Sequence, residues 1–77
     1  MDRAPGASRI TIANDNVAGV LGQVLSVLAE RQVNVIDMMN KSRGELAYNI
    51  IDVDGAPDPA VTAAIQAVPH VIRVRVV

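Results

Sequence analysis

The sequence predicts a small α+β domain in which two helices cover one face of a four-stranded antiparallel sheet. One observation is a turn signal at Arg43-Gly44 between two runs of strand-forming residues, since glycine supplies the positive φ that tight hairpin turns need. Another is the spacing of apolar residues. They alternate near both ends of the chain, as in strands, and recur every three to four residues on either side of the hairpin, as in helices. The resulting order, β-α-β-β-α-β, is that of a ferredoxin-like sandwich.

The first predicted strand spans residues 9–13, where Ile10 and Ile12 share one face and polar neighbours the other. Asn14-Asp15-Asn16 follows and offers three residues that favour helix N-caps. A helix ending near Arg31-Gln32 is predicted from an apolar stripe at helical spacing, made of Val17, Val20, Leu21, Val24 and Leu28.

The predicted hairpin joins strands at residues 33–39 and 46–53. With Arg43-Gly44 as a two-residue loop, Ser42 faces Glu45 and the pairs run outward from there. One face then holds Val33, Val35, Met39, Leu46, Tyr48 and Ile50. The other holds Ile36, Met38, Ala47, Ile51 and Val53. Helices can cover only one of these apolar faces, so we expect the open face or a sheet edge to meet another chain.

The second helix is predicted to follow the strand-breaking Gly55-Ala56-Pro57, with Asp58 as its cap and Pro59 at its first position. Pro69 ends this helix, whose short apolar stripe is Val61, Ala64, Ile65 and Val68. The closing strand spans residues 71–77. Its alternation predicts inward-facing Ile72, Val74 and Val76, and outward-facing Arg73 and Arg75.

The composition of the 77-residue chain excludes several classes of protein. A net charge of −1 and a single aromatic residue give no grip on phosphates and no stacking platform, so nucleic acid is not an expected partner. No apolar run approaches the roughly 20 residues of a membrane span, and residues 1–8 lack a signal core. We expect a cytoplasmic protein with a flexible leader at residues 1–8. The 51% hydrophobic content fits either a filled aliphatic core or burial against a second copy.

No catalytic constellation is found in the sequence. His70 lies in a turn where solvation is expected, and no nucleophile elbow surrounds any serine. In the predicted register Asp37 and Asp52 share a sheet face without lying opposite each other, so an acid pair is not expected. The absence of cysteine excludes a thiolate metal site, and no metal or cofactor is expected. We therefore predict a non-enzymatic domain; an acylphosphatase shares the topology, but its phosphate loop with an arginine is missing after the first strand.

One segment, residues 14–23, has the character of a ligand site. The first turn of a helix presents unpaired N–H groups and a positive dipole end, which suit a carboxylate. Gly19 and Gly22 allow close approach, and the amides of Asn14 and Asn16 can both donate and accept hydrogen bonds. An amino acid needs such a mixed set. The alternative is that the asparagines cap the helix and the glycines allow tight packing.

The most distinctive motif is Asn40-Lys41-Ser42-Arg43-Gly44-Glu45-Leu46-Ala47-Tyr48. It is accompanied by the stretches 12–17, 22–23, 28–30, 33–35, 51–53 and 72–75. Together these segments resemble an ACT domain, and more closely the C-terminal regulatory domain of D-3-phosphoglycerate dehydrogenase. The resemblance covers nearly all of residues 9–77, and residues 1–8 are similar to the linker before that domain.

The resemblance implies a regulatory domain that binds a small amino acid, L-serine in the serine-sensitive relatives, between two paired copies. It also implies a catalytic NAD-dependent dehydrogenase domain in the same or a partner chain. By position, the ligand-binding residues are Asn14, Asn16, Gly19, Val20, Leu21 and, across the dimer, Asn34. Serine-responsive relatives often have His at the position of Asn14 and Pro at that of Ala18. The alternative of a different class is a purely structural dimerisation domain without an effector.

Overall fold

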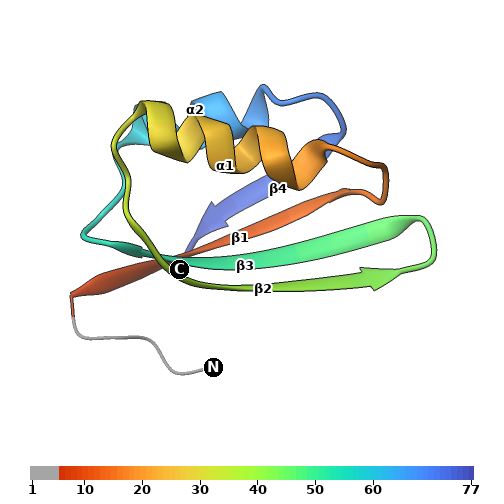
Figure 1. The fold of residues 1–77 in the computed structure, drawn as a ribbon, viewed down its shortest axis with the longest axis horizontal. Helices are drawn as coiled ribbons and strands as arrows, with labels where there is room; N and C mark the ends of the chain where they lie inside the picture. Colours follow the sequence, from red (N-terminus) through yellow and green to blue (C-terminus); the bar gives the residue numbers. More distant parts are fainter. Residues whose placement is uncertain (1–5) are drawn as a thin grey trace.

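The computed structural model describes residues 6–77 and confirms the predicted fold class. The elements are β1 (Ala7–Asp15), α1 (Val20–Glu30), β2 (Val35–Arg43), β3 (Leu46–Asp54), α2 (Pro59–Gln66) and β4 (Val71–Val76). The strands form one sheet in the order β2-β3-β1-β4, with antiparallel neighbours throughout. Both helices lie on the same face of this sheet, which leaves the other face open (Figure 1). Neither helix in this part of the chain is long and apolar enough to cross a membrane.

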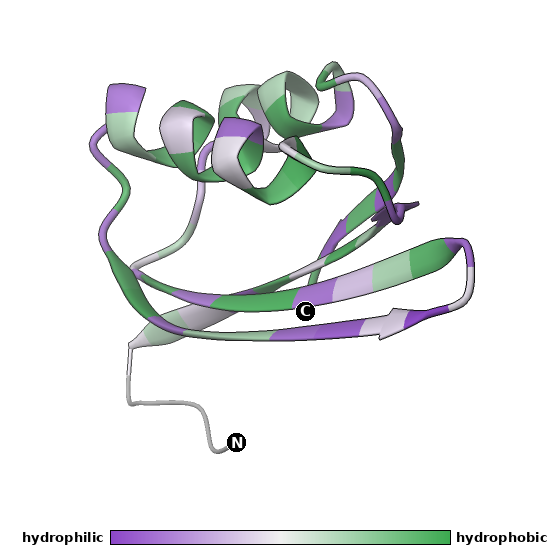
Figure 2. Ribbon diagram, turned by 45° about the vertical axis from the view of Figure 1, so that its right-hand side comes forward, coloured by the Kyte–Doolittle hydropathy of each residue, from purple (hydrophilic) through white to green (hydrophobic). Residues whose placement is uncertain are grey.

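The core lies between the helices and the sheet and is wholly aliphatic. It consists of Ile10, Ile12, Val20, Val24, Leu28, Ile51, Val53, Val61, Ile65 and Val68. Each helix carries hydrophobic and hydrophilic residues, as an element buried on one side requires (Figure 2). Full burial of one such side chain stabilises the fold by about 1.5–3 kcal/mol, so these residues account for most of the driving force for folding.

The start of α1 differs from the prediction. The helix begins at Val20 with Gly19 as its N-cap, and β1 continues through Asn14 to Asp15. Tertiary hydrogen bonds hold this segment extended, since the N–H of Asp15 donates to His70 O over 2.9 Å and the N–H of Asn16 to Glu45 O over 2.8 Å. The predicted asparagine cap is therefore wrong, because partners distant in sequence compete successfully with local capping.

The end of α1 lies where the sequence predicts it. The N–H of Gln32 donates to Ala29 O, and the N–H of Val33 donates to Leu28 O over 2.9 Å, which together form a Schellman motif. Gln32 occupies the left-handed position of this motif with φ 59°, where glycine is the usual residue. Leu28 belongs to the core and Val33 packs against it, as is common for the apolar residues that flank a Schellman motif.

The start of α2 also follows the prediction. The Asp58 side chain accepts a hydrogen bond of 2.9 Å from the N–H of Ala60, and Pro59 is the first helical residue. Val61 and Ile65 face the core from this short helix. In this case capping is decided locally, so the sequence alone is sufficient to predict it.

The hairpin loop is Gly44-Glu45 rather than Arg43-Gly44, because Arg43 pairs with Leu46. Gly44, with φ 63°, becomes the first loop residue. The change slides the pairing by two residues, which leaves each side chain near the loop on its predicted face. A bulge between Val35 and Asp37 then reverses the start of β2. Val35 packs against the core instead of the open face, and Ile36 is exposed.

A second bulge alters the predicted facing of β4. The register shifts between Ala13 and Asn14 of β1, which pair with Arg73 and Val71 respectively and leave Ile72 as the extra residue. Ile72 is consequently 53% exposed, not inward-facing as predicted. Val76 is also exposed, and only Val74 packs against the core as expected.

The predicted leader overlaps the sheet by two residues, since β1 begins at Ala7. Gly6 precedes the strand, and residues 1–5 of the predicted leader lie outside the described residues.

Candidate functional site

The predicted ligand residues lie at two ends of α1. Asn14, Asn16, Gly19, Val20 and Leu21 are brought together where β1 ends and α1 begins. The sixth predicted residue, Asn34, immediately precedes β2 beyond the other end of the helix (Figure 1). An eleven-residue helix is about 16 Å long, so one chain does not gather the whole predicted set.

Asn14 belongs to a chain of hydrogen-bonded amides, here called the asparagine ladder, which runs from the exposed Asn40 through the buried Asn49 to the buried Asn14. The Nδ2 of Asn40 donates to Oδ1 of Asn49 over 2.6 Å, and the Nδ2 of Asn49 donates to Oδ1 of Asn14 over 2.8 Å. The Nδ2 of Asn14 in turn donates to Asp15 O over 2.8 Å. Asn14 and Asn49 are 3% and 2% exposed, so the ladder fixes the end of β1 from inside the fold.

Asn16 lies in the loop after β1 and is exposed. Its Nδ2 donates to Gly44 O over 3.1 Å, in addition to the backbone bond from its N–H to Glu45 O. The β1–α1 loop is thereby attached to the hairpin loop. Within residues 6–77 no donor contacts Oδ1 of Asn16, and the side chain is exposed. The oxygen of this amide is therefore available to a ligand.

The N-terminus of α1 carries no side-chain cap. Gly19 adopts φ 89°, a left-handed conformation in which a side chain would be strained. Gly22 is exposed within the first turns, and a Cβ built there would meet no atom within 4 Å. Nothing inside the described chain requires glycine at this helical position, where it costs roughly 1 kcal/mol relative to alanine. The residue leaves the helix backbone accessible from outside.

Two surface concavities of the described structure bear on the candidate site. One, of about 430 Å³, lies between the β1–α1 loop, the hairpin loop and the α2–β4 turn, and its lining includes Asn16, Gly44 and His70. The other, of about 520 Å³, lies on the open face of the sheet. Asn16 is the one predicted ligand residue that lines either of them. The remaining predicted residues line neither of these two concavities.

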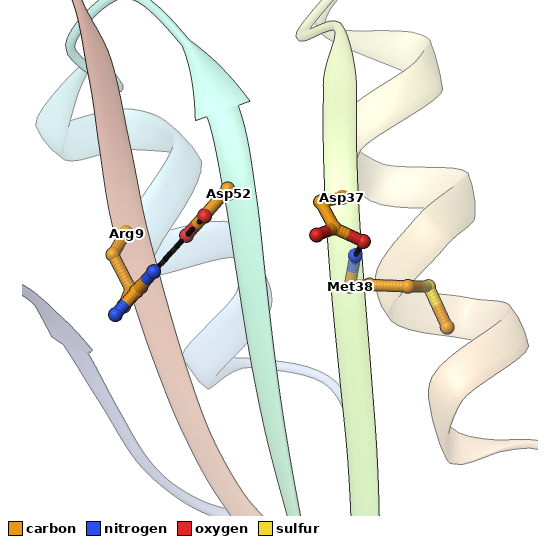
Figure 3. A network of polar contacts seen from close by, with 4 residues as sticks. All are labelled: Arg9, Asp37, Met38 and Asp52. Carbon is orange, nitrogen blue, oxygen red and sulfur yellow. Dashed lines mark hydrogen bonds and ion pairs between the residues drawn. The ribbon is translucent and has the colours of Figure 1, made fainter. Parts of the chain in front are cut away.

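The acidic residues of the sheet are arranged differently from the prediction. Asp37 and Asp52 are directly paired across β2 and β3. Nε and Nη2 of Arg9 donate to the two carboxylate oxygens of Asp52 over 2.8 and 3.1 Å, and Asp37 accepts a bond from the N–H of Met38 (Figure 3). The bidentate arginine offsets the repulsion that two opposed carboxylates would otherwise have.

The ladder partners Asn40 and Asn49 were not among the residues predicted from the sequence. The neighbours of Asn49 two residues away along β3, Ala47 and Ile51, are buried in the core. Asn40 is the cross-strand partner of Asn49. A polar residue at an inward position is the signal that indicates a buried hydrogen-bond network. The one-residue error in the hairpin loop paired Asn40 with Ala47, so the signal was not recognised.

His70 and Asp15 lie side by side at the same end of the sheet, with 3.3 Å between Nδ1 and Oδ2. Both side chains are about half exposed, at 53% and 50%, so this contact contributes little to stability. Among residues 6–77, no cluster of His, Asp or Glu is arranged to hold a metal ion.

Comparison with known proteins gives a consistent result. Residues 8–70 match the family model of the ACT domain. The chain is 31% identical over 72 residues to D-3-phosphoglycerate dehydrogenase of Escherichia coli strain K12, and equally to that of Shigella flexneri. The match covers 91% of this chain but only 18% of each relative's length.

Among solved structures, the ACT domain from GTP pyrophosphokinase of Chlorobium tepidum superposes with a TM-score of 0.79 at 12% identity, covering 92% of this chain and 96% of that one. An ACT domain protein from Streptococcus pneumoniae gives a TM-score of 0.71 at 17% identity, covering 92% and 86%. These likenesses show the fold, and the family model accounts for most of the sequence. The chain belongs to the ACT domain family.

Proposed function

We propose that this domain binds a small amino acid, L-serine, between two copies of the chain and thereby regulates a phosphoglycerate dehydrogenase of serine biosynthesis. The catalytic domain would lie in the same chain or in a partner chain. The dehydrogenase relatives support this context, since their matched segment is a small part of their length. In this role the domain is regulatory and cytoplasmic, and it catalyses no reaction itself.

The observation that carries the proposal is the uncapped N-terminus of α1. Its first-turn N–H groups, approached past Gly19 and Gly22, would receive the ligand carboxylate, and Asn16 would bind a polar group of the same ligand. Val20 and Leu21 contribute through their backbone. Asn14 is too buried for direct contact, so it acts through the asparagine ladder by fixing the strand end.

The topology supports a partner contribution from Asn34. β2 is an edge strand, so a second copy can add its own β2 antiparallel to it. That pairing would place the Asn34 end of one β2 beside the Arg43 end of the other. The hairpin loop at that end is bonded to Asn16, so Asn34 of the partner subunit would approach the α1 N-terminus.

Calorimetric titration of the domain with the twenty amino acids tests the function directly. We expect saturable heat with L-serine and a stoichiometry of one bound ligand per chain. Heats at background level for all twenty would contradict the effector role and favour a structural dimerisation domain.

Replacing Asn34 with alanine is expected to weaken serine binding by about 1–3 kcal/mol, because a polar group at the ligand would lose its partner. Folding is expected to change little, since Asn34 is exposed and its backbone carbonyl still accepts from the N–H of Asp54. Titration calorimetry and urea denaturation measure the two quantities. Asp37→Asn is the control, because Asp37 is remote from the β1–α1 loop of its own chain. This variant is expected to leave the affinity for serine unchanged. A loss of stability with intact affinity would make Asn34 structural.

The pairing itself predicts the effect of a charge at the β2 edge. Met38 is 38% exposed and points away from β3 (Figure 3). The wild-type chain is expected to sediment as a dimer at micromolar concentration, and Met38→Glu as a monomer, because burial of an unpaired charge is costly. Ile72→Glu, on the open face, is the matched control and is expected to remain dimeric. Dissociation by Ile72→Glu but not by Met38→Glu would move the interface to the open face.

A further inference from the structure

The open face of the sheet contains a trough whose floor is the inner strand β1. Its residues on this face, Thr11 and Ala13, are small. Across the β1–β3 ladder Thr11 pairs with Ile50 and Ala13 with Tyr48, so larger side chains line one side of the floor. Tyr48 is 48% exposed, which leaves much of its ring accessible. The concavity measures about 520 Å³, a volume within the usual range for sites that bind small molecules.

The opposite wall of the trough is cationic. On β4, Arg75 pairs with Thr11 and Arg73 with Ala13, so the two guanidinium groups lie across the floor from Ile50 and Tyr48. The bulge in β4 adds Ile72 at one end of this wall. The trough therefore combines an aromatic and aliphatic wall with a wall of two arginines.

The open face carries charges of both signs. The register places Arg9, Lys41, Arg43, Arg73 and Arg75 on it, together with Asp15, Asp37, Asp52 and Asp54. Arg9 is paired with Asp52, whereas within residues 6–77 the guanidinium groups of Arg73 and Arg75 form no ion pair. The trough thus offers two uncompensated cations to an incoming anion.

We propose that the trough binds a small organic anion with a flat apolar body, of the aromatic carboxylate class. The body would lie on Thr11 and Ala13 against the ring of Tyr48, and the carboxylate would pair with Arg73 and Arg75.

This site is separate from the amino-acid site of the α1 N-terminus. The trough lies on the sheet face away from both helices, whereas the N-terminus of α1 lies on the covered face (Figure 1). Its lining includes none of the loop residues assigned to serine. Binding at the trough can therefore be tested whether or not the domain responds to serine.

Titration of the ¹⁵N-labelled chain with 2-naphthoate and its uncharged analogue 2-naphthamide tests the proposal by NMR. We expect saturable shifts at the amides of Thr11, Ala13, Tyr48 and Arg73, and about tenfold tighter binding of the carboxylate, the margin of one charge-assisted hydrogen bond. Equal affinities, shifts confined to the helices, or no saturation would each overturn the proposal.

Two sets of variants test separately whether binding at the trough depends on the charge of the probe and on its apolar body. Arg73→Gln combined with Arg75→Gln is expected to abolish the preference for 2-naphthoate, while the matched charge removal Arg31→Gln at the end of α1 leaves it intact. Ala13→Leu is expected to fill the floor and to prevent binding of both probes. If the double arginine variant keeps the preference, these residues do not select the anion and the assignment is wrong.

Discussion

Replacing Arg9 with methionine is expected to lower the free energy of unfolding by about 3 kcal/mol, the range for breaking one partner of a buried ion pair. Asp52 is 1% exposed, and its carboxylate would lose two arginine bonds of 2.8 and 3.1 Å. The carboxylate would also face Asp37, its cross-strand neighbour, without the charge of Arg9. For a domain of this size such a loss is a large fraction of total stability. Urea denaturation followed by circular dichroism measures it.

The double variant Arg9→Met with Asp52→Leu is the control for this prediction. Apolar replacement of both partners of a buried ion pair is often neutral or stabilising, so most of the loss is expected to be recovered. If the single variant unfolds at the wild-type urea concentration, the pair contributes no more than an exposed salt bridge, and the argument from burial is wrong.

Replacing Asn49 with alanine is expected to cost about 2–3 kcal/mol, because Oδ1 of the buried Asn14 loses its donor and a cavity is left. The effect should extend to function, since Asn14 fixes the end of β1 from which the ligand loop departs. Urea denaturation and serine titration of the same variant measure the two consequences.

Asn40→Ala is the matched control for Asn49. It removes one bond of the ladder, the 2.6 Å contact to Oδ1 of Asn49, from an exposed side chain. Water can replace this donor, so a loss of only about 0.5–1 kcal/mol is expected. Equal losses at the two positions would show that burial does not decide the energetics of the ladder.

The candidate site could be predicted from sequence only in part. A strand-to-helix junction was predicted in this region because it is a local feature, although β1 ends and α1 begins later in the chain than predicted. The roles within it were not, because Asn14 and Asn16 are held by Asn49, Gly44 and Glu45 from the hairpin. Those contacts depend on register, which the sequence left uncertain by one loop residue.

The sequence by itself determined the order of elements, the aliphatic core and the α2 cap, because hydrophobic period and capping act over a few neighbouring residues. The tertiary structure decided what depends on strand pairing. The bulges at Ile36 and Ile72 changed the facing of residues at the start of both edge strands, and the asparagine ladder kept Asn14 in a strand rather than at a helix cap. One extra residue in a ladder moves every following side chain to the other face, and that choice is made by packing between segments far apart in the chain.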